Sequence, residues 1–266
     1  MSTIGFIGAG NMAQAIIKGI INAGLYSSQN IIISDITPGQ LELCTRQFGV
    51  TTTTCNTELV TRSDVIVLSI KPQVMGSILD EIKESVTPDK TIISIAAGIT
   101  TSKIAAAVGS VPIIRVMPNT PALVGCGMAG LFSANADQNT MKTATDIFSA
   151  IGQAVVVDSE DLIDAVTAVS GSGPAYFFLM MEQMIHAGTK LGLDKDTATQ
   201  LVLQTAKGAA LLAEQSDDTP DVLRQKVTSP GGTTQAALEV FQSHNFDQTV
   251  EAALAAADKR AKELSK

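Results

Sequence analysis

Short apolar runs alternate with helix-forming stretches as far as residue 157, and this alternation constrains the fold more than any other feature of the sequence. The apolar runs are rich in Ile and Val, a composition typical of strands that are buried on both faces. Strands that alternate with helices predict a parallel sheet with helices on both sides. The predicted strands are residues 3–7, 30–34, 65–69, 91–95, 113–116, 128–131 and 154–157, and the predicted helices between them are residues 12–23, 40–48, 74–85, 101–107 and 139–151.

The pattern changes after Asp158, and no convincing strand follows. Ser159 can cap a helix that begins there, with Glu160 and Asp161 favourable in its first turn. Long segments rich in Ala, Leu, Met and Gln come next, and these residues favour helices. The sequence therefore predicts an α/β domain with a doubly wound parallel sheet at 1–158, followed by an all-α domain at 159–266. The predicted helices of the second domain are residues 175–191, 195–214, 233–243 and 246–264.

The composition argues against several kinds of partner. Asp and Glu outnumber Lys and Arg by 26 to 18, and this acidic balance disfavours a nucleic-acid backbone. Three separated cysteines and two histidines do not predict a metal site. The sequence starts without a secretory signal pattern, and no apolar run reaches the ~20 residues of a spanning helix. We therefore expect a cytoplasmic protein that binds no nucleic acid, membrane or metal.

A glycine-rich turn follows the first predicted strand and opens the first predicted helix. Gly8 permits a tight turn, Gly10 lets a phosphate approach the backbone, and Ala13 lets the helix pack closely on the strand. This spacing is typical of Rossmann domains, in which the N–H groups of the helix N-terminus face a dinucleotide pyrophosphate. The alternative is a turn of small residues that only packs a strand against a helix. Because the turn agrees in position with the later alternation, we favour dinucleotide binding.

The choice between the two nicotinamide cofactors stays open. Asp35 ends the second predicted strand, where an acidic residue usually binds the adenine ribose hydroxyls and favours NAD over NADP. Ser34 and Thr37 can instead bind a 2′-phosphate, although no Arg stands nearby in the sequence to pair with it. A third possibility is that Asp35 is a turn residue ahead of Pro38.

Three further loops follow predicted strands, at residues 69–72, 95–98 and 117–121. Because ligands of open α/β sheets bind beyond the carboxyl ends of the strands, these loops are expected at the same edge. Small side chains at Ala96 and Ala97 leave room for a cofactor ring, and Asn119 can contact its amide or its ribose.

Two glycine-containing segments and one apolar stretch stand out in the helical half. Residues 170–176 begin a helix, and their glycines allow a close approach by another helix or by a nicotinamide ring. Residues 229–234 form a turn whose N–H groups can bind a carboxylate, with a simple helix cap as the alternative. The apolar residues 175–181 form either an internal helix or a subunit interface. We favour the interface, because so thin a helical layer cannot hide this much apolar surface.

Taken together, these motifs resemble the pyrroline-5-carboxylate reductase family, in the family's order and over nearly the whole chain. The resemblance rests on residues 6–12, 71–72, 94–98, 115–121, 170–176 and 229–234, of which the last two segments are the most specific. It implies a helical domain that interlocks into homodimers, which can assemble further into a decamer. It also implies reduction of L-1-pyrroline-5-carboxylate to L-proline by NADPH or NADH.

The resemblance implies roles for individual residues. Thr234 would be the catalytic residue that hydrogen-bonds the ring nitrogen. Ser229 and the backbone N–H groups of Gly232 and Thr233 would hold the substrate carboxylate, and Glu160 matches another substrate-site residue. Lys226 stands where a residue that contacts the cofactor can occur. The resemblance also implies a set of residues that line the cofactor, to which Asp35 and Asn119 are added because each follows a predicted strand. The full set is Ile7, Gly8, Ala9, Gly10, Asn11, Met12, Ser34, Asp35, Asn56, Ser69, Ile70, Lys71, Pro72, Ile95, Ala96, Ala97 and Asn119.

The site has no obvious His or buried carboxylate as a proton donor, which fits an imine that arrives as the cation. Catalysis would then be mainly positioning. Two other functions stay open. A β-hydroxyacid dehydrogenase shares the architecture, but the Gly-x-x-x-Lys pattern of those enzymes is absent at Gly171 and Gly173. A non-catalytic dinucleotide sensor would leave the turn at 229–234 unexplained.

Overall fold

The computed structural model describes residues 2–265, and the chain divides by its contacts into two compact units. The first unit extends to Ser172 and takes in the chain again from Ala257 onward, whereas the second unit is Gly173–Ala256. Helix α7 (Leu162–Val166) packs against the strands of the first unit, which extends this unit beyond residue 158. By contacts alone, the division therefore falls later than the change of sequence pattern.

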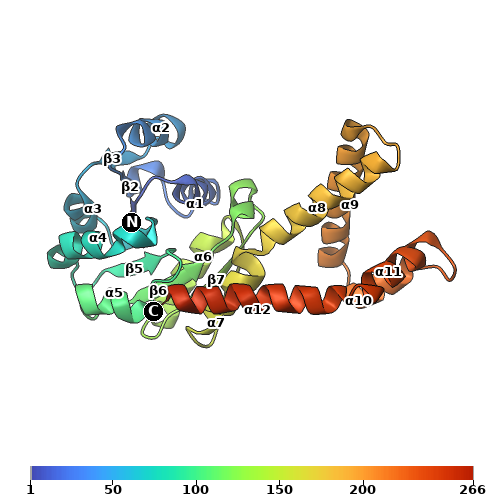
Figure 1. Cartoon of the computed structure of the whole chain (residues 1–266). Helices are drawn as coiled ribbons and strands as arrows, with labels where there is room; N and C mark the ends of the chain where they lie inside the picture. Colours follow the sequence, from blue (N-terminus) through green and yellow to red (C-terminus); the bar gives the residue numbers. More distant parts are fainter. Residues whose placement is uncertain (1, 266) are drawn as a thin grey trace. The chain divides into compact units, whose positions relative to one another are not determined.

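Within residues 2–265, an eight-stranded sheet forms the centre of the first unit, in the order β3-β2-β1-β4-β5-β6-β7-β8 (Figure 1). β1 lies inside the sheet, third from one edge, and pairs in parallel with both β2 and β4. The seven predicted strands are confirmed, with ends that differ by one or two residues. The strands are β1 (Ile4–Ile7), β2 (Ile31–Ser34), β3 (Thr51–Thr53), β4 (Val65–Leu68), β5 (Thr91–Ser94), β6 (Ile113–Met117), β7 (Gly127–Phe132) and β8 (Gly152–Val156).

Two features of the sheet differ from the sequence prediction. The sequence does not predict β3, which is a short run of three partly buried threonines at the sheet edge. Strand β7 runs antiparallel to β6, with Phe132 opposite Arg115. The connection between them holds only the short 3₁₀ helix η4 (Thr120–Val124). Because a parallel pair needs a longer crossover, the chain reverses here instead.

Hydrophobic side chains pack on both faces of the sheet, because successive residues of a strand point to opposite sides. Phe6 and Ile33 belong to the cluster on one face, and Ile7 and Ile32 belong to the cluster on the other. The doubly wound fold is thereby confirmed. The first face is covered by α1 (Asn11–Asn22), α2 (Pro38–Phe48) and α6 (Gln138–Ser149), and the second by α3 (Asn56–Arg62), α4 (Met75–Ile82) and α5 (Thr101–Val108).

All the secondary structure of the second unit, Gly173–Ala256, is helical, with turns and loops between the helices. Its first two helices pack against each other, and Asp194 caps the second of them by accepting a hydrogen bond from the Thr197 N–H. The predicted all-α region is thus confirmed, with one additional short helix, α10. The helices are α8 (Gly173–Lys190), α9 (Lys195–Gln215), α10 (Pro220–Lys226), α11 (Thr233–Ser243) and α12 (Phe246–Leu264), and the last turns of α12 belong to the first unit.

The segment before α8 corrects one local prediction. A helix beginning at Ser159 is wrong, because α7 begins at Leu162 and its N-cap residue Asp161 makes no side-chain cap. α7 continues through the π-helical turn η5 (Thr167–Gly171), in which the Ser172 N–H donates to the Thr167 carbonyl. The resulting helix Leu162–Lys190 is long and apolar enough to cross a membrane, by length and composition only. This is weak evidence for a membrane span, because core helices of soluble proteins share these two properties.

Candidate active site

The carboxyl ends of β1, β2, β4 and β5 meet at one edge of the sheet, because these strands are parallel neighbours. Ligands of open α/β sheets bind at this edge. A hollow of about 650 Å³ near Tyr26, Asp64 and Asp89 lies at the opposite edge, at the amino ends of the strands. The fold therefore gathers at the ligand edge the predicted cofactor residues that end or follow these strands: Ile7, Gly8, Ala9, Ser34, Asp35, Ser69, Ile70, Ile95 and Ala96.

The turn after β1 is held by the ends of both neighbouring strands. The Gly8 N–H donates to the Ser34 carbonyl at 2.8 Å. Ser69 Oγ donates toward the carbonyl oxygens of Ile7 and Gly8, at 2.9 and 2.8 Å. Gly8 has a φ of 101°, and a Cβ there would lie 2.5 Å from the Ser69 carbonyl oxygen. Only glycine fits this position.

Gly10 stands at the N-cap of α1 and leaves the end of the helix open. No side chain caps this helix, and the N–H groups of Gly10, Asn11 and Met12 bond to nothing within residues 2–265. A Cβ added at Gly10 would meet no atom within 4 Å. Open N–H groups at the positive end of a helix dipole bind phosphate well. The residues here therefore fit a dinucleotide pyrophosphate.

Polar contacts order the residues that follow β2. Asp35 accepts hydrogen bonds from the Ala9 N–H at Oδ2 and from the Thr37 N–H at Oδ1, both at 2.8 Å. Ser34 Oγ donates to Asn56 Oδ1 at 2.7 Å, so two of the predicted cofactor residues contact each other. Asn56 Nδ2 in turn donates to the carboxylate of Glu81 at 2.9 Å. This corner of the sheet edge therefore carries two carboxylates.

The other predicted cofactor residues lie on two loops beside the sheet. Lys71 is exposed and precedes the short 3₁₀ helix η2 (Pro72–Val74). Ala96 is buried, and its N–H donates to Ser94 Oγ, which keeps the start of the next loop close to β5. Ala97, the third residue of this loop, is half-buried.

The side chain of Asn119 is engaged at both ends by the protein. Its Nδ2 donates to the carbonyl oxygen and the hydroxyl of Ser170, and its Oδ1 accepts from the Met128 N–H at 2.9 Å. These bonds tie the η4 loop to the π-helical turn. A contact between Asn119 and the cofactor stays a prediction.

The glycine turn of the second unit presents open donors at the start of α11. The Gly232 N–H donates to the Ser229 carbonyl at 3.0 Å and closes the turn. In the described part of the chain, the Thr233 N–H and the Thr234 hydroxyl have no hydrogen-bond partner, and no side chain caps α11. The helix-cap alternative for Thr234 therefore has no support. Of the two predicted backbone donors, only the N–H of Thr233 is open.

Sequence reasoning missed Gln235, which holds this turn from within. Its Oε1 accepts the Gly231 N–H at 2.7 Å, and its Nε2 donates to Glu239 at 2.9 Å. A Gln at the third helical position that reaches back before the helix is a known capping pattern, so the signal was present in the sequence. Lys226, whose role the sequence left open, forms an ion pair with Asp218.

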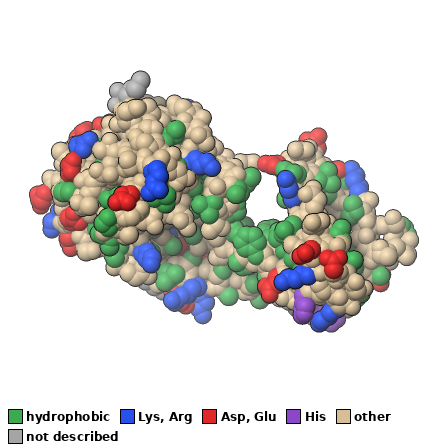
Figure 2. All heavy atoms as spheres, turned by 90° about the horizontal axis from the view of Figure 1, so that it is seen from above, with side chains coloured by type: hydrophobic (Ala, Val, Ile, Leu, Met, Phe, Trp, Pro, Cys, Tyr) green, Lys and Arg blue, Asp and Glu red, His purple; other side chains and the backbone are tan. Residues whose placement is uncertain are grey.

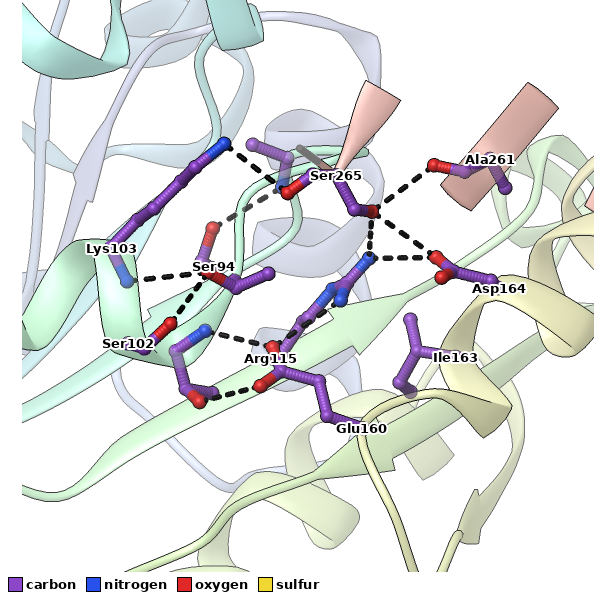
Figure 3. Close-up of polar contacts among 12 residues, drawn as sticks. Ser94, Ser102, Lys103, Arg115, Glu160, Ile163, Asp164, Ala261 and Ser265 are labelled. Atoms are coloured by element: carbon purple, nitrogen blue, oxygen red, sulfur yellow. Dashed lines mark hydrogen bonds and ion pairs between the residues drawn. The ribbon is translucent and has the colours of Figure 1, made fainter. Parts of the chain in front are cut away.

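A buried ionic cluster around Arg115 was also missed (Figure 3). Arg115 Nη1 lies 3.3 Å from Glu160 Oε1, and its Nη2 lies 3.2 Å from Asp164 Oδ1. Glu160 also accepts hydrogen bonds from the backbone N–H and the hydroxyl of Thr101, both at 2.8 Å. The first-turn role predicted for Glu160 is therefore wrong, because its carboxylate serves the start of α5 instead. Its place at the substrate stays a prediction.

A doubly wound sheet with an open glycine turn at its ligand edge, followed by a helical unit, defines a Rossmann-type oxidoreductase that uses a nicotinamide dinucleotide. Two family models match the chain: "Pyrroline-5-carboxylate reductase dimerisation" at residues 160–264, and "NADP oxidoreductase coenzyme F420-dependent" at residues 3–98. These matches follow the same order as the two parts of the fold.

Known proteins match over the full length. The pyrroline-5-carboxylate reductase of Pseudomonas aeruginosa is 46% identical, covering 100% of this chain and 98% of that protein. The structure of a pyrroline-5-carboxylate reductase from Coxiella burnetii has a TM-score of 0.94 at 42% identity, covering 100% and 99% of the two chains. That of Plasmodium falciparum pyrroline carboxylate reductase with NADP bound has a TM-score of 0.88 at 34% identity, covering 100% and 98%. The chain belongs to the pyrroline-5-carboxylate reductase family.

Proposed function

We propose that this protein reduces L-1-pyrroline-5-carboxylate to L-proline with NADPH or NADH, the last step of proline biosynthesis. The observation that carries the proposal is the open N-terminus of α11, where the Thr233 N–H and the Thr234 hydroxyl are unpaired within the described residues. A second open helix N-terminus at Gly10 suits the dinucleotide. The family membership favours this function over the β-hydroxyacid dehydrogenase alternative.

The turn at 229–234 supplies the groups that bind the substrate carboxylate. The Thr233 N–H and the exposed Ser229 hydroxyl donate to it, and the positive end of the α11 dipole adds to the attraction. The Gly232 N–H can contribute only as a shared donor, because it already bonds to the Ser229 carbonyl. Gln235 keeps the turn in shape by holding the Gly231 N–H.

A bound reduced nicotinamide supplies the hydride for the imine carbon. The chain's own contribution is to hold the imine in place and to bind its nitrogen. The Thr234 hydroxyl oxygen accepts a hydrogen bond from the protonated ring nitrogen and orients the ring. Because the substrate arrives as an iminium cation, no side chain has to deliver a proton before the hydride moves.

The cofactor lies along residues 7–12 and the loops at 69–72 and 95–97, with Ser34, Asp35, Asn56 and Asn119 beside it. The Plasmodium falciparum relative has NADP bound, and a similar mode suits this chain. Asp35 and Glu81 place negative charge where a 2′-phosphate would lie, which weakens NADPH relative to NADH. The family therefore favours NADPH, and Asp35 leaves NADH open.

We assign dinucleotide binding to residues 1–158, and dimerisation and substrate binding to residues 159–266, of which α7 and the end of α12 pack with the first unit. The helical unit contains an apolar hollow of about 1010 Å³, lined by Met184, Leu201 and Phe241 among others. Phe177 and Phe178 on α8 are 68% and 61% exposed. Figure 2 shows such exposed hydrophobic side chains in green on the body that carries the purple histidines.

Monomeric proteins rarely expose this much contiguous apolar surface, so a second copy of the chain covers it. The dimer is the unit from which a decamer can assemble. A second copy that covers this surface also explains why the helix Leu162–Lys190 is so apolar, and no membrane is needed to explain it. The net charge of −8 disfavours nucleic acid as a partner. We place the protein in the cytoplasm.

Two assays test the function. Purified protein should oxidise NADPH and NADH when L-1-pyrroline-5-carboxylate is added, and should reduce NAD(P)⁺ with L-proline at alkaline pH. A protein that binds the dinucleotide in calorimetry but turns over neither substrate would be a non-catalytic sensor. Oxidation of 3-hydroxy acids in place of proline would restore the dehydrogenase alternative.

A further inference from the structure

The Arg115 cluster joins four segments of the first unit (Figure 3). Arg115 itself lies on β6 with a side chain that is 3% exposed. It pairs with Glu160 ahead of α7, with Asp164 on α7, and with Ser265 after α12, whose hydroxyl lies 3.3 Å from Nη2. One guanidinium thus balances two carboxylates in a buried place, where removing either partner is costly.

The cluster reaches the loop that follows β5. Glu160 uses both carboxylate oxygens on Thr101, the first residue of α5, directly after this loop. Gly98 of this loop lies close to the end of α12: it has a φ of 73°, and a Cβ there would sit 2.5 Å from the Leu264 carbonyl oxygen. Lys103 Nζ donates to the Ser265 carbonyl at 3.2 Å. The loop is therefore clamped at its junction with α5, and it lies close against the end of α12 at Gly98.

The clamped loop carries Ile95, Ala96 and Ala97, which line the cofactor in the proposed function. A carboxylate that accepts an N–H and a hydroxyl from one residue fixes that residue in both distance and direction. The carboxylate is fixed in turn by the buried guanidinium. A shift of the loop by a fraction of an ångström would change its fit to the dinucleotide, because binding sites depend on geometry at this scale.

We propose that Glu160, held by Arg115, is a positioning residue that sets the loop at 95–100 for dinucleotide binding. This inference rests on one part of the proposed function, namely that the loop at 95–97 lines the cofactor. The end of α12 completes the clamp through Leu264 and Ser265.

The test compares Glu160→Gln with Asp161→Asn, a neighbouring exposed carboxylate that takes no part in the cluster. The Gln side chain keeps the size of Glu but cannot neutralise Arg115, and only one of its two polar atoms can accept from Thr101. We expect the Kd for NADPH and NADH, measured by calorimetry without substrate, to rise about 10-fold. The KM for L-1-pyrroline-5-carboxylate should rise by a smaller factor than the dinucleotide Kd, and Asp161→Asn should match the wild type in both constants.

Thr101→Val tests the other end of the same contact. It removes the hydroxyl bond to Glu160 but keeps the backbone N–H bond, so it should raise the dinucleotide Kd less than Glu160→Gln does. The double variant should add little to Glu160→Gln, because the hydroxyl bond joins the two residues. Thr101→Ser keeps the hydroxyl and should bind the dinucleotide like the wild type. If Glu160→Gln does not fold, the Thr101 pair decides the matter alone.

Three outcomes would overturn the proposal. A raised KM for the imine with an unchanged dinucleotide Kd would place Glu160 at the substrate. A lowered melting temperature with both constants unchanged would leave it a purely structural role, and additive effects in the double variant would separate it from Thr101. Failure of the proposed function is distinguishable, since the Kd is measured without the imine and does not require turnover.

Discussion

The backbone N–H of Ala9 donates a hydrogen bond to the side chain of Asp35, with 2.8 Å between N and Oδ2. The other carboxylate oxygen accepts from the Thr37 N–H. Asp35 therefore cannot turn away from the glycine-rich turn, and its negative charge is fixed at the corner where β2 ends. A ribose 2′-hydroxyl can still approach this carboxylate, whereas a 2′-phosphate would be repelled.

This geometry predicts a change in cofactor preference for Asp35→Ser. Loss of the charge should raise the NADPH-to-NADH ratio of kcat/KM about 10-fold, which corresponds to about 1.4 kcal/mol. Asp35→Asn removes the charge but keeps the shape and one acceptor, and should move the ratio in the same direction. Steady-state kinetics with both cofactors measure it. A ratio that neither variant changes would make Asp35 a turn residue only.

Gly10→Val tests the pyrophosphate cradle. The added side chain meets no protein atom near its Cβ, so the fold should be unaffected. The Val side chain would occupy the space beside the open N–H groups of α1, where the phosphates are expected. It should therefore weaken the binding of both dinucleotides more than about 10-fold, because the phosphates would lose their hydrogen bonds to these groups. Gly76→Val on α4, also in open space, is the matched control. Wild-type dinucleotide affinity in Gly10→Val would remove the turn from the site.

The sheet could be predicted from the sequence where local pattern and packing agree. Runs such as Ile31–Ser34 are buried on both faces, and their Ile content signals this directly. β3 escaped prediction because Thr51–Thr53 is short and lies at the edge, where pairing with β2 decides its conformation. The antiparallel direction of β7 follows from the short connection after β6, and the pattern that identifies strands does not give their direction.

The candidate site was predictable only where it is local in sequence. The spacing alone predicts the tight turn at Gly8 and a phosphate-binding role for Gly10, because the turn and the helix start are neighbours in the chain. Glu160 contacts Thr101, which is 59 residues away in the sequence, and Arg115, which is 45 residues away. The periodicity of apolar residues does not predict contacts between such distant positions. The use of the Gly232 N–H inside its own turn likewise follows from backbone geometry that the residue types do not reveal.

Stability in acid should depend on Asp137, the N-cap of α6. The Thr140 N–H donates to its carboxylate and lowers the pKa of Asp137 in the folded protein. A pKa lower in the folded than in the unfolded state stabilises the protein above the unfolded value of about 3.9, and this contribution is lost as the pH falls through the folded value. Asp137→Asn should therefore show a smaller fall in melting temperature below about pH 4. Calorimetry from pH 7 to pH 2 tests this, and equal falls in both proteins would contradict it.

The exposed face of α8 should hold the oligomer together. The wild type should sediment as a dimer or larger, and Phe178→Asp should shift it toward the monomer, because a carboxylate cannot be buried there without a partner. Leu43→Asp on α2, a 40% exposed position outside the helical unit, should leave the assembly intact. Sedimentation equilibrium over a range of concentrations measures the difference. A stable, active wild-type monomer would refute the interface.

We expect substrate orientation to depend on Thr234. One neutral hydrogen bond contributes ~0.5–1.5 kcal/mol and a charged one up to about 3 kcal/mol, so Thr234→Ala should cost roughly 10- to 100-fold in kcat/KM for the imine. Cofactor affinity should be unchanged, and Thr234→Ser should keep most of the activity because the hydroxyl remains. The hydroxyl makes no capping bond in α11, so the melting temperature of the Ala variant should stay near that of the wild type. Kinetics and calorimetry on both variants separate the two roles: a lowered melting temperature with unchanged kcat/KM would assign Thr234 to the helix and remove it from the site.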